Sequence, residues 1–186
     1  MKRFFDFSIS FLCLVLLIIP LIVLSVIIVS TSKGPALYWS KRIGKHNEPF
    51  YMPKFRTMNI ETPEVATHLL DDPTNFYTPV GKFLRKYSID ELPQLYSILL
   101  GDMSLVGPRP ALHNQDDLIE LRTDEGIHNL VPGITGLAQI SGRDELTIKN
   151  KVEIDKVYLL RKSFTYDLYI IWLTLLKVIK GVGISH

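Results

Sequence analysis

Two adjacent carboxylates, Asp90 and Glu91, lie close in the sequence to basic side chains that suit chemistry on phosphate esters. Three basic residues precede the pair: Lys82, Arg85 and Lys86. Arg109 follows it, in a Gly-Pro-Arg-Pro segment. Guanidinium groups form paired hydrogen bonds to phosphate oxygens, and carboxylates hold Mg²⁺ or attack phosphorus. The sequence therefore predicts a phosphate-ester site around these two carboxylates.

The position of Pro93 bears on which residue begins the helix that carries the pair. Ser88 at the N-cap with Glu91 three residues later would be a capping box, which is a purely structural use of Glu91. That register puts Pro93 at N5, where the helix needs an amide hydrogen. Asp90 at the cap puts the proline at N3, where the missing donor matters little. We therefore expect Asp90 at the N-cap, exposed and ionised beside the positive helix end, with the helix ending at Gly101.

Other basic side chains are candidates for the same site. Pro108 and Pro110 hold Arg109 in an extended, stiff backbone, so its side chain should lose little entropy on binding phosphate. Lys54 and Arg56 belong to a basic stretch that would contact anionic lipid headgroups or, as a sharper alternative, a phosphorylated ligand.

A glycine-punctuated segment, 131–143, ends in a further basic residue, Arg143. Its glycine spacing matches neither a P-loop nor a dinucleotide-binding fingerprint. We expect a loop there, whose glycines would let the backbone approach a ligand closely.

An uncharged run, Phe7–Ser32, is long enough to cross a bilayer, which takes about 20 residues. We expect a retained anchor rather than a signal peptide, because no small-residue cleavage site follows it. Pro20 predicts a kink, and each arm around it spans roughly 17 Å, about half the apolar core. Basic residues flank both ends, which the positive-inside rule places in the cytoplasm. A re-entrant hairpin and a kinked single span both remain open on these residues.

The rest of the chain predicts short elements. Strands at 35–40 and 49–56, separated by turn residues, would form a β-hairpin. Helices are expected over 79–87, 111–130 and 147–162. The apolar run 168–179 is too short to cross a bilayer, at roughly 18 Å as a helix. It fits either a helix lying in the membrane interface or a buried core helix.

Composition limits the classes of function. The formal net charge is +2, which gives no reason to expect a nucleic-acid partner. The single cysteine, Cys13, allows no intrachain disulfide, and the five histidines lack zinc-site spacing. The 186 residues fit one domain with an appended membrane segment.

Three motifs resemble the bacterial sugar transferase family, the monotopic phosphoglycosyl transferases. They are S-I-D-E-L-P-Q-L at 88–95, G-D-M-S-L-V-G-P-R-P at 101–110 and P-G-I-T-G-L-A-Q-I-S-G-R at 132–143. The stretch K-F-R-T-M at 54–58 also matches. The resemblance covers nearly the whole chain, and its short length resembles the minimal, PglC-like form of the family.

This resemblance implies a mainly α fold with a small β-hairpin in a monotopic membrane protein. Residues 1–32 would be a re-entrant membrane helix kinked near Pro20, and 33–186 a catalytic domain with an interfacial helix near 167–180. The implied location is the cytoplasmic face of the bacterial inner membrane. One departure is Ile19 before Pro20, where relatives often have serine, and this puts the kink geometry in doubt.

The resemblance also implies an activity. A sugar 1-phosphate would pass from a UDP-sugar to undecaprenyl phosphate in the lipid bilayer, with Mg²⁺ and release of UMP. Asp90 would be the nucleophile, forming a covalent aspartyl-phosphosugar adduct, and the Mg²⁺ ligand, with Glu91 as a base or orienting group. Arg85 and Arg109 match phosphate-binding positions. Lys54, Arg56 and Arg143 lie in matching motifs, and Asp167 matches a further acidic position of less certain role.

Two other functions remain open on the residues alone. A non-catalytic, membrane-anchored interaction module in polysaccharide assembly would explain the anchor, although not the Asp90, Glu91 and Arg109 arrangement. A hydrolase of lipid pyrophosphates would release inorganic phosphate. The sequence does not name the sugar, and it leaves both a monomer and a homodimer open.

Overall fold

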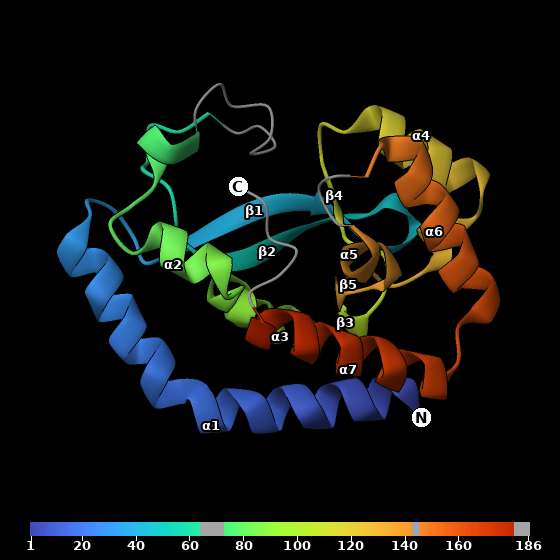
Figure 1. The fold of residues 1–186 in the computed structure, drawn as a ribbon, viewed down its shortest axis with the longest axis horizontal. Helices are drawn as coiled ribbons and strands as arrows, with labels where there is room; N and C mark the ends of the chain where they lie inside the picture. The colour runs from blue at the N-terminus through green and yellow to red at the C-terminus, as the bar shows by residue number, and fades with distance from the viewer. Residues whose placement is uncertain (64–72, 143–145, 181–186) are drawn as a thin grey trace.

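The computed structural model describes residues 1–63, 73–142 and 146–180. Helices dominate, and a small β-sheet lies inside the curve formed by the first helix (Figure 1). The helical content and the β-hairpin predicted from the sequence are confirmed.

The first element, α1, is one helix over Lys2–Thr31 with Pro20 inside it. Figure 1 shows that α1 is strongly bent, as the missing amide of an internal proline predicts. By length and composition it could cross a membrane, and only 6% of its most apolar window is buried in the protein. Both arms still pack on the domain by one side, through Leu14 on the first arm and Leu24 and Ile28 on the second.

The β-hairpin follows α1 directly. Strand β1, Leu37–Ile43, pairs antiparallel with β2, Pro49–Phe55, around a turn that contains the 3-10 helix η1, Lys45–Asn47. A short strand, β4, Ala111–Leu112, extends the sheet on the other side of β1.

Four short helical segments lie between residues 73 and 100. A 3-10 turn, η3, Pro73–Phe76, precedes α2, Gly81–Lys86. A further 3-10 segment, η4, Ile89–Gln94, leads into α3, Leu95–Leu100. The predicted end at Gly101 is confirmed, because this residue has φ 104°, a left-handed conformation that glycine adopts without strain.

The middle of the chain differs from the expectations. The helix expected over 111–130 is shorter: it comprises α4, Asp116–Asp124, preceded by β4 and followed by η5, Ile127–Asn129. The loop expected over 131–143 contains β5, Gly133–Thr135, and α5, Leu137–Ser141. Strand β5 pairs in parallel with β3, Ser104–Val106. Strands of two or three residues that pair across the chain leave no periodic pattern, which explains why the sequence did not reveal them.

Two long helices close the fold. The predicted helix after residue 147 is α6, Ile148–Arg161, capped by the Thr147 hydroxyl, which accepts from the Asn150 amide at 3.2 Å. The last helix, α7, Phe164–Lys180, begins a few residues before the expected start.

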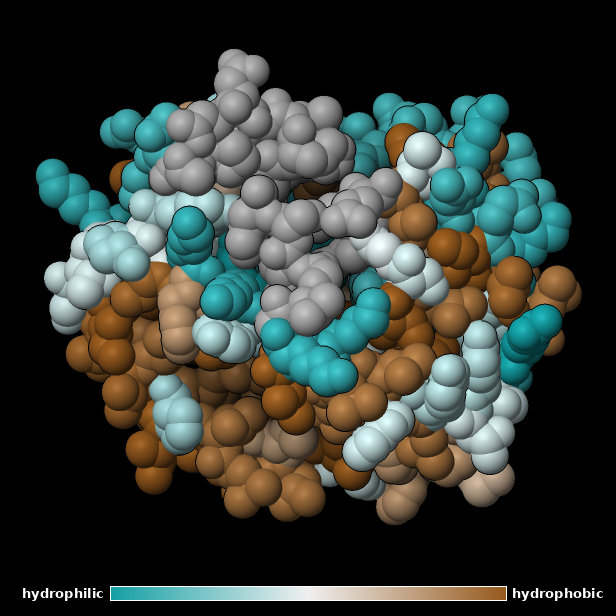
Figure 2. Space-filling view, in the orientation of Figure 1, coloured by the Kyte–Doolittle hydropathy of each residue, from teal (hydrophilic) through white to brown (hydrophobic). Residues whose placement is uncertain are grey.

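Helix α7 lies beside the first arm of α1, where the rings of Phe5 and Phe164 pack edge to face at 5.1 Å (Figure 1). Asp167 and Ile170 on one side of α7 are buried, whereas Trp172 and Leu175 elsewhere on this helix are exposed. Figure 2 shows hydrophobic surface in brown gathered where α1 and α7 lie. A half-buried helix with an apolar outer side fits the interfacial interpretation better than a core helix.

Candidate active site

Asp90 and Glu91 lie in the 3-10 segment η4, so the prediction that Asp90 caps an α-helix is wrong. Ser88 precedes η4 with φ 53°, and its side chain makes no capping hydrogen bond, so the capping-box alternative is also wrong. The Glu91 amide donates to the Ser88 carbonyl at 3.2 Å, as the i to i+3 pattern of a 3-10 helix requires. Pro93 cannot donate, and the regular helix begins only at Leu95.

Both carboxylates are buried. Asp90 is 7% exposed and Glu91 is 6% exposed, so the expectation of an exposed Asp90 is wrong. Successive residues of a 3-10 helix point about 120° apart, from three residues per turn. The two side chains therefore point in different directions, although they are adjacent in the sequence.

Glu91 is the point at which two basic side chains meet. Arg109 Nη2 lies 2.7 Å from Glu91 Oε1, and Lys54 Nζ lies 3.6 Å from the same oxygen. Lys54 comes from β2, and Arg109 from the connection between β3 and β4. The structure thus brings together three residues that the sequence predicted for one site.

Electrostatics make Lys54 unusual. The pKa of Lys54 is lowered from its ordinary 10.5 to about 7, chiefly by burial. Arg109 and Arg42 also lower this pKa, and Glu91 and Asp90 raise it. A lysine in this state is near the midpoint of its titration at neutral pH. Asp90 acts on the Lys54 amine, so it belongs to the same charged cluster.

The backbone around Arg109 is set by glycines. A Cβ on Gly133 would overlap with the backbone of Gly107, so these two segments can approach only because neither residue has a side chain. The Gly107 amide donates to Thr135 at 2.9 Å, and the Gly133 amide donates to Pro108 at 2.9 Å. Strand β5, Gly133–Thr135, therefore supports the backbone segment that carries Arg109.

Arg85 lies in the last turn of α2, just before η4. Its Nε donates to Thr57 Oγ1 at 2.9 Å, and its guanidinium carbon lies 5.3 Å from the centre of the Tyr77 ring. These contacts orient a half-buried guanidinium next to the segment that carries Asp90. Its predicted role in phosphate binding stays a prediction.

Arg56 makes contacts of a structural kind. Its guanidinium donates to the carbonyls of Ser32, Lys33, Gly34 and Pro35, and to the Ser32 hydroxyl. These groups form the connection between α1 and β1, and Arg56 is 6% exposed. The structure does not bring Arg56 to Glu91, and phosphate binding by Arg56 stays a prediction.

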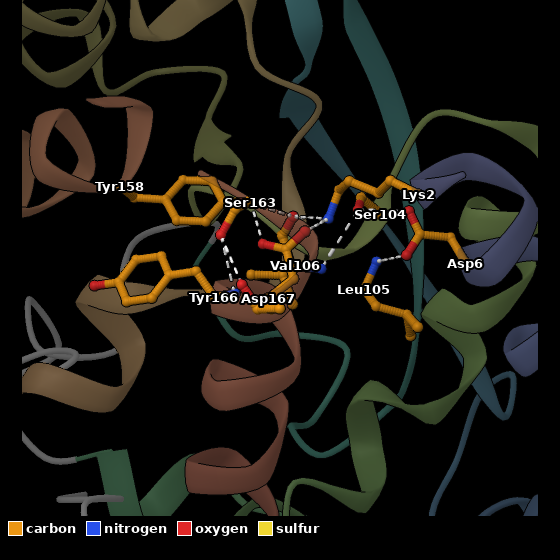
Figure 3. Close-up of polar contacts among 10 residues, drawn as sticks. Lys2, Asp6, Ser104, Leu105, Val106, Tyr158, Ser163, Tyr166 and Asp167 are labelled. Atoms are coloured by element: carbon orange, nitrogen blue, oxygen red, sulfur yellow. Dashed lines mark hydrogen bonds and ion pairs between the residues drawn. The ribbon is translucent and has the colours of Figure 1, made fainter. Parts of the chain in front are cut away.

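Asp167 lies in a second polar cluster, at the start of α1 (Figure 3). Lys2 Nζ lies 2.6 Å from Asp167 Oδ2, and the Tyr158 hydroxyl donates to Asp167 Oδ1 at 2.7 Å. Burial and the bond to this carboxylate raise the pKa of Tyr158. Arg143, the remaining predicted phosphate ligand, lies outside the described residues.

The donor groups of the described residues bear on the predicted Mg²⁺ site. Within residues 1–63, 73–142 and 146–180, no group of three or more His, Cys, Asp or Glu side chains could hold a metal ion by itself. Mg²⁺ commonly binds through one or two carboxylates together with substrate phosphates. The carboxylates of the Asp90–Glu91 pair fit that mixed coordination, and the assignment of Asp90 as the Mg²⁺ ligand stays a prediction.

Comparison with known proteins gives a family. The family model described as bacterial sugar transferase matches residues 1–181. The chain belongs to the bacterial sugar transferase family. The resemblance stated from the motifs is confirmed.

Three relatives within the family are informative. An uncharacterized sugar transferase, EpsL, of Bacillus subtilis is 42% identical, over 100% of this chain and 91% of its own length. An undecaprenyl-phosphate galactose phosphotransferase of Salmonella typhimurium is 36% identical, over 98% of this chain and 41% of its own. A UDP-glucose:undecaprenyl-phosphate glucose-1-phosphate transferase of Klebsiella pneumoniae is 38% identical, over 95% and 39%. This bacterial sugar transferase thus spans about two fifths of these two phosphotransferases.

Sequence reasoning missed Arg42 in this family member. Arg42 donates to the Pro110 carbonyl at 3.3 Å and contributes to the low pKa of Lys54. In the hairpin register Tyr38 pairs with Lys54 and Arg42 with Phe50, so Arg42 and Lys54 share a face of the sheet. Strand alternation would have grouped them if the first strand, predicted to end at residue 40, had been extended to Ile43.

Proposed function

We propose that this protein transfers a sugar 1-phosphate from a UDP-sugar to undecaprenyl phosphate and releases UMP. The observation that carries the proposal is the convergence of Lys54 and Arg109 on Glu91, next to the buried Asp90. A pyrophosphate carries several negative charges, so a site for it needs cations that outweigh its carboxylates. The named reactions of the Salmonella and Klebsiella relatives support the lipid acceptor and the class of donor.

The first step uses Asp90 as the nucleophile. A carboxylate oxygen attacks the phosphorus that bears the sugar, the bond from this phosphorus to the bridging oxygen breaks, and UMP leaves with the electron pair. Asp90 then carries the phosphosugar as an acyl phosphate. Mg²⁺, when bound, would neutralise phosphate charge and make UMP a better leaving group.

The second step regenerates Asp90. An oxygen of undecaprenyl phosphate attacks the same phosphorus, and the Asp90 carboxylate leaves, which yields the lipid diphosphate sugar. The covalent adduct lets a soluble donor and a membrane-bound acceptor react in turn.

Of the two roles expected for Glu91, its contacts favour orientation over proton transfer. Glu91 Oε1 is 2.7 Å from Arg109 Nη2 and 3.6 Å from Lys54 Nζ. Glu91 holds these two cations in place before the donor binds. The phosphates of the donor would then also attract them. The attacking groups are a carboxylate and a phosphate, so neither step needs a base to remove a proton from a hydroxyl group.

The proposed membrane arrangement is a re-entrant α1 with the domain on the cytoplasmic face. Three charged residues in the first turns of α1 contact the domain: Lys2, Arg3 and Asp6. Arg56 of the same domain holds the far end of α1 at Ser32. Two ends attached to one body support a helix that enters and leaves through the same face, and the basic flanks support the cytoplasmic side. Residues 1–32 would then be the membrane segment and 33–186 the catalytic domain.

The test is a two-part assay with the full chain in detergent or nanodiscs. UDP-glucose and UDP-galactose, radiolabelled in the sugar, are incubated with Mg²⁺, first without and then with undecaprenyl phosphate. We expect label on Asp90 and a stoichiometric amount of UMP without the lipid, and continued UMP release with labelled lipid once it is added. Asp90→Asn should abolish both, whereas Asp116→Asn, which changes an exposed carboxylate on α4, should abolish neither.

Three results would contradict the proposal. Full turnover by Asp90→Asn would contradict the covalent intermediate on Asp90. Inorganic phosphate in place of UMP would indicate a hydrolase. No reaction with any member of a UDP-sugar panel would favour the non-catalytic interaction module.

A further inference from the structure

We infer that Arg122 and Asp155 are positioning residues that hold Arg109 in place for catalysis, an inference that rests on the proposed function of the Asp90–Glu91 site. Arg122 lies in α4 and Asp155 in α6. Arg122 Nη1 donates to the Arg109 carbonyl at 2.8 Å, and its Nε and Nη2 donate to Asp155 Oδ2 at 3.1 and 2.6 Å.

The connection around Arg109 depends on donors from outside itself. Pro108 and Pro110 have no amide hydrogen, so this turn cannot supply the usual internal hydrogen bonds. Its three successive carbonyls instead accept from three different elements. Gly133 of β5 donates to Pro108, Arg122 of α4 to Arg109 and Arg42 of β1 to Pro110, at 2.9, 2.8 and 3.3 Å.

Of these three donors, Arg122 is the one that hydrogen-bonds to Arg109 itself. Arg122 holds the backbone of Arg109 by a hydrogen bond to its carbonyl. Glu91 holds the side chain of Arg109 by an ion pair to its guanidinium. A misplacement of about 1 Å in a group that contacts the reacting phosphate can cost roughly 100-fold in rate. Loss of the Arg122 contact should therefore lower kcat/KM as well as the stability of the fold.

Asp155 sets the direction in which Arg122 points. Asp155 is 1% exposed and accepts from two guanidinium nitrogens, which leaves Nη1 directed at the Arg109 carbonyl. Burial raises the pKa of Asp155, and Arg122 opposes this increase. Because either charge alone would be costly at this depth, the two residues form one unit.

The same two helices offer a matched control. Lys156 of α6 and Glu125, at the end of α4, form an ion pair of 2.6 Å whose side chains are 40% and 35% exposed. This pair joins α6 to the end of α4. Within the described residues, its hydrogen bonds and ion pairs do not include the Arg109 turn. Glu125→Gln should therefore weaken helix packing without moving Arg109.

The test is a double-mutant cycle in the full chain, with UDP-glucose or UDP-galactose as the donor that the wild type turns over. Arg122→Lys keeps the charge but removes the planar guanidinium, whose separate nitrogens bond Asp155 and the Arg109 carbonyl. We expect kcat/KM for the donor to fall about 10- to 100-fold in Arg122→Lys and to stay unchanged in Glu125→Gln. In an Arg109→Ala background, Arg122→Lys should have little further effect, because it acts through the missing side chain.

A second measurement does not require activity. Amide hydrogen exchange of the peptide 104–112 should be faster in Arg122→Lys than in the wild type, and unchanged in Glu125→Gln. This result would stand even if the wild type released no UMP, which would overturn the proposed function alone. If Arg122→Lys does not fold, Asp155→Asn takes its place in the same cycle.

Two outcomes would overturn the inference. One is wild-type kcat/KM and exchange in a folded Arg122→Lys or Asp155→Asn protein. The other is an equal loss of kcat/KM with and without the Arg109 side chain, since that would indicate general destabilisation.

Discussion

Arg109 and Glu91 form an ion pair of 2.7 Å between a proline-flanked connection and a 3-10 turn. The same Glu91 oxygen also lies 3.6 Å from Lys54 of the hairpin. One carboxylate oxygen therefore organises cations from two other parts of the chain. This arrangement leads to a test of what Glu91 does.

Glu91→Gln should keep the shape of the side chain and remove its charge. We expect kcat/KM for the donor to fall about 100-fold, because Arg109 and Lys54 lose the anion that holds them. The pKa of Lys54 should also fall below about 7, since Glu91 raises it. Initial rates measure the first effect, and NMR titration of ¹³C-labelled lysine, assigned with Lys54→Arg, measures the second. A pKa that does not fall would contradict the assigned electrostatics.

Stability should depend on pH through Lys54. Its folded-state pKa is lowered to about 7 from 10.5. Between these values the unfolded chain binds a proton that the folded chain does not, so stability rises with pH across this window. Below about pH 7 both states are protonated, and the cost of burying the charge is fully present.

Thermal unfolding of wild type and Lys54→Met between pH 6 and pH 9 measures this dependence. The Tm of the wild type should increase relative to that of Lys54→Met as the pH rises above about 7. A constant difference over the whole range would contradict the lowered pKa.

Gly133→Ala should destabilise the protein strongly. The new Cβ would overlap with the Gly107 backbone, so one segment must move and Arg109 with it. We expect a loss of about 3 kcal/mol or more, together with loss of activity. Gly126→Ala is the control, because Gly126 has φ 71° but open space around its Cβ position, and it should cost only about 1 kcal/mol. Similar Tm values for the two variants would show that the close approach is unimportant.

Pro20→Leu should change the membrane topology. A straight α1 of 30 residues would be about 45 Å long, enough to cross a bilayer. Without the proline, the two ends should no longer both reach the domain, and an N-terminal epitope should become accessible to protease in spheroplasts. Ile19→Leu keeps the proline and is the control. An epitope that stays protected in Pro20→Leu would contradict a role of the proline in the bend.

Local signals predicted much of the fold. Thr147 caps α6, Gly101 ends α3 and the hairpin lies where turn residues separate two strands. Each of these depends on a few neighbouring residues, which a single sequence displays. The internal Pro20 likewise predicted the bend of α1.

Features that depend on distant partners were missed. The helix register at Asp90 was wrong because the segment after Ser88 forms a 3-10 turn, which the rule for capping an α-helix does not describe. Strands β3 and β5 escaped notice because they stabilise one another across the chain. For the site, residue types grouped Glu91 with Arg109 and Lys54, which lie together in the structure, whereas the structural contacts of Arg56 could not be seen without the fold.

The pairing of Lys2 with Asp167 joins residues 165 positions apart. Ribosomes add about 5–20 residues per second, so Lys2 waits roughly 8–33 s for its partner to be made. During that time the apolar helix has already left the ribosome, with its first charged turn still unpaired. Attachment of the start of α1 to α7 must therefore be a late step in biogenesis, completed only after Asp167 of α7 is synthesised.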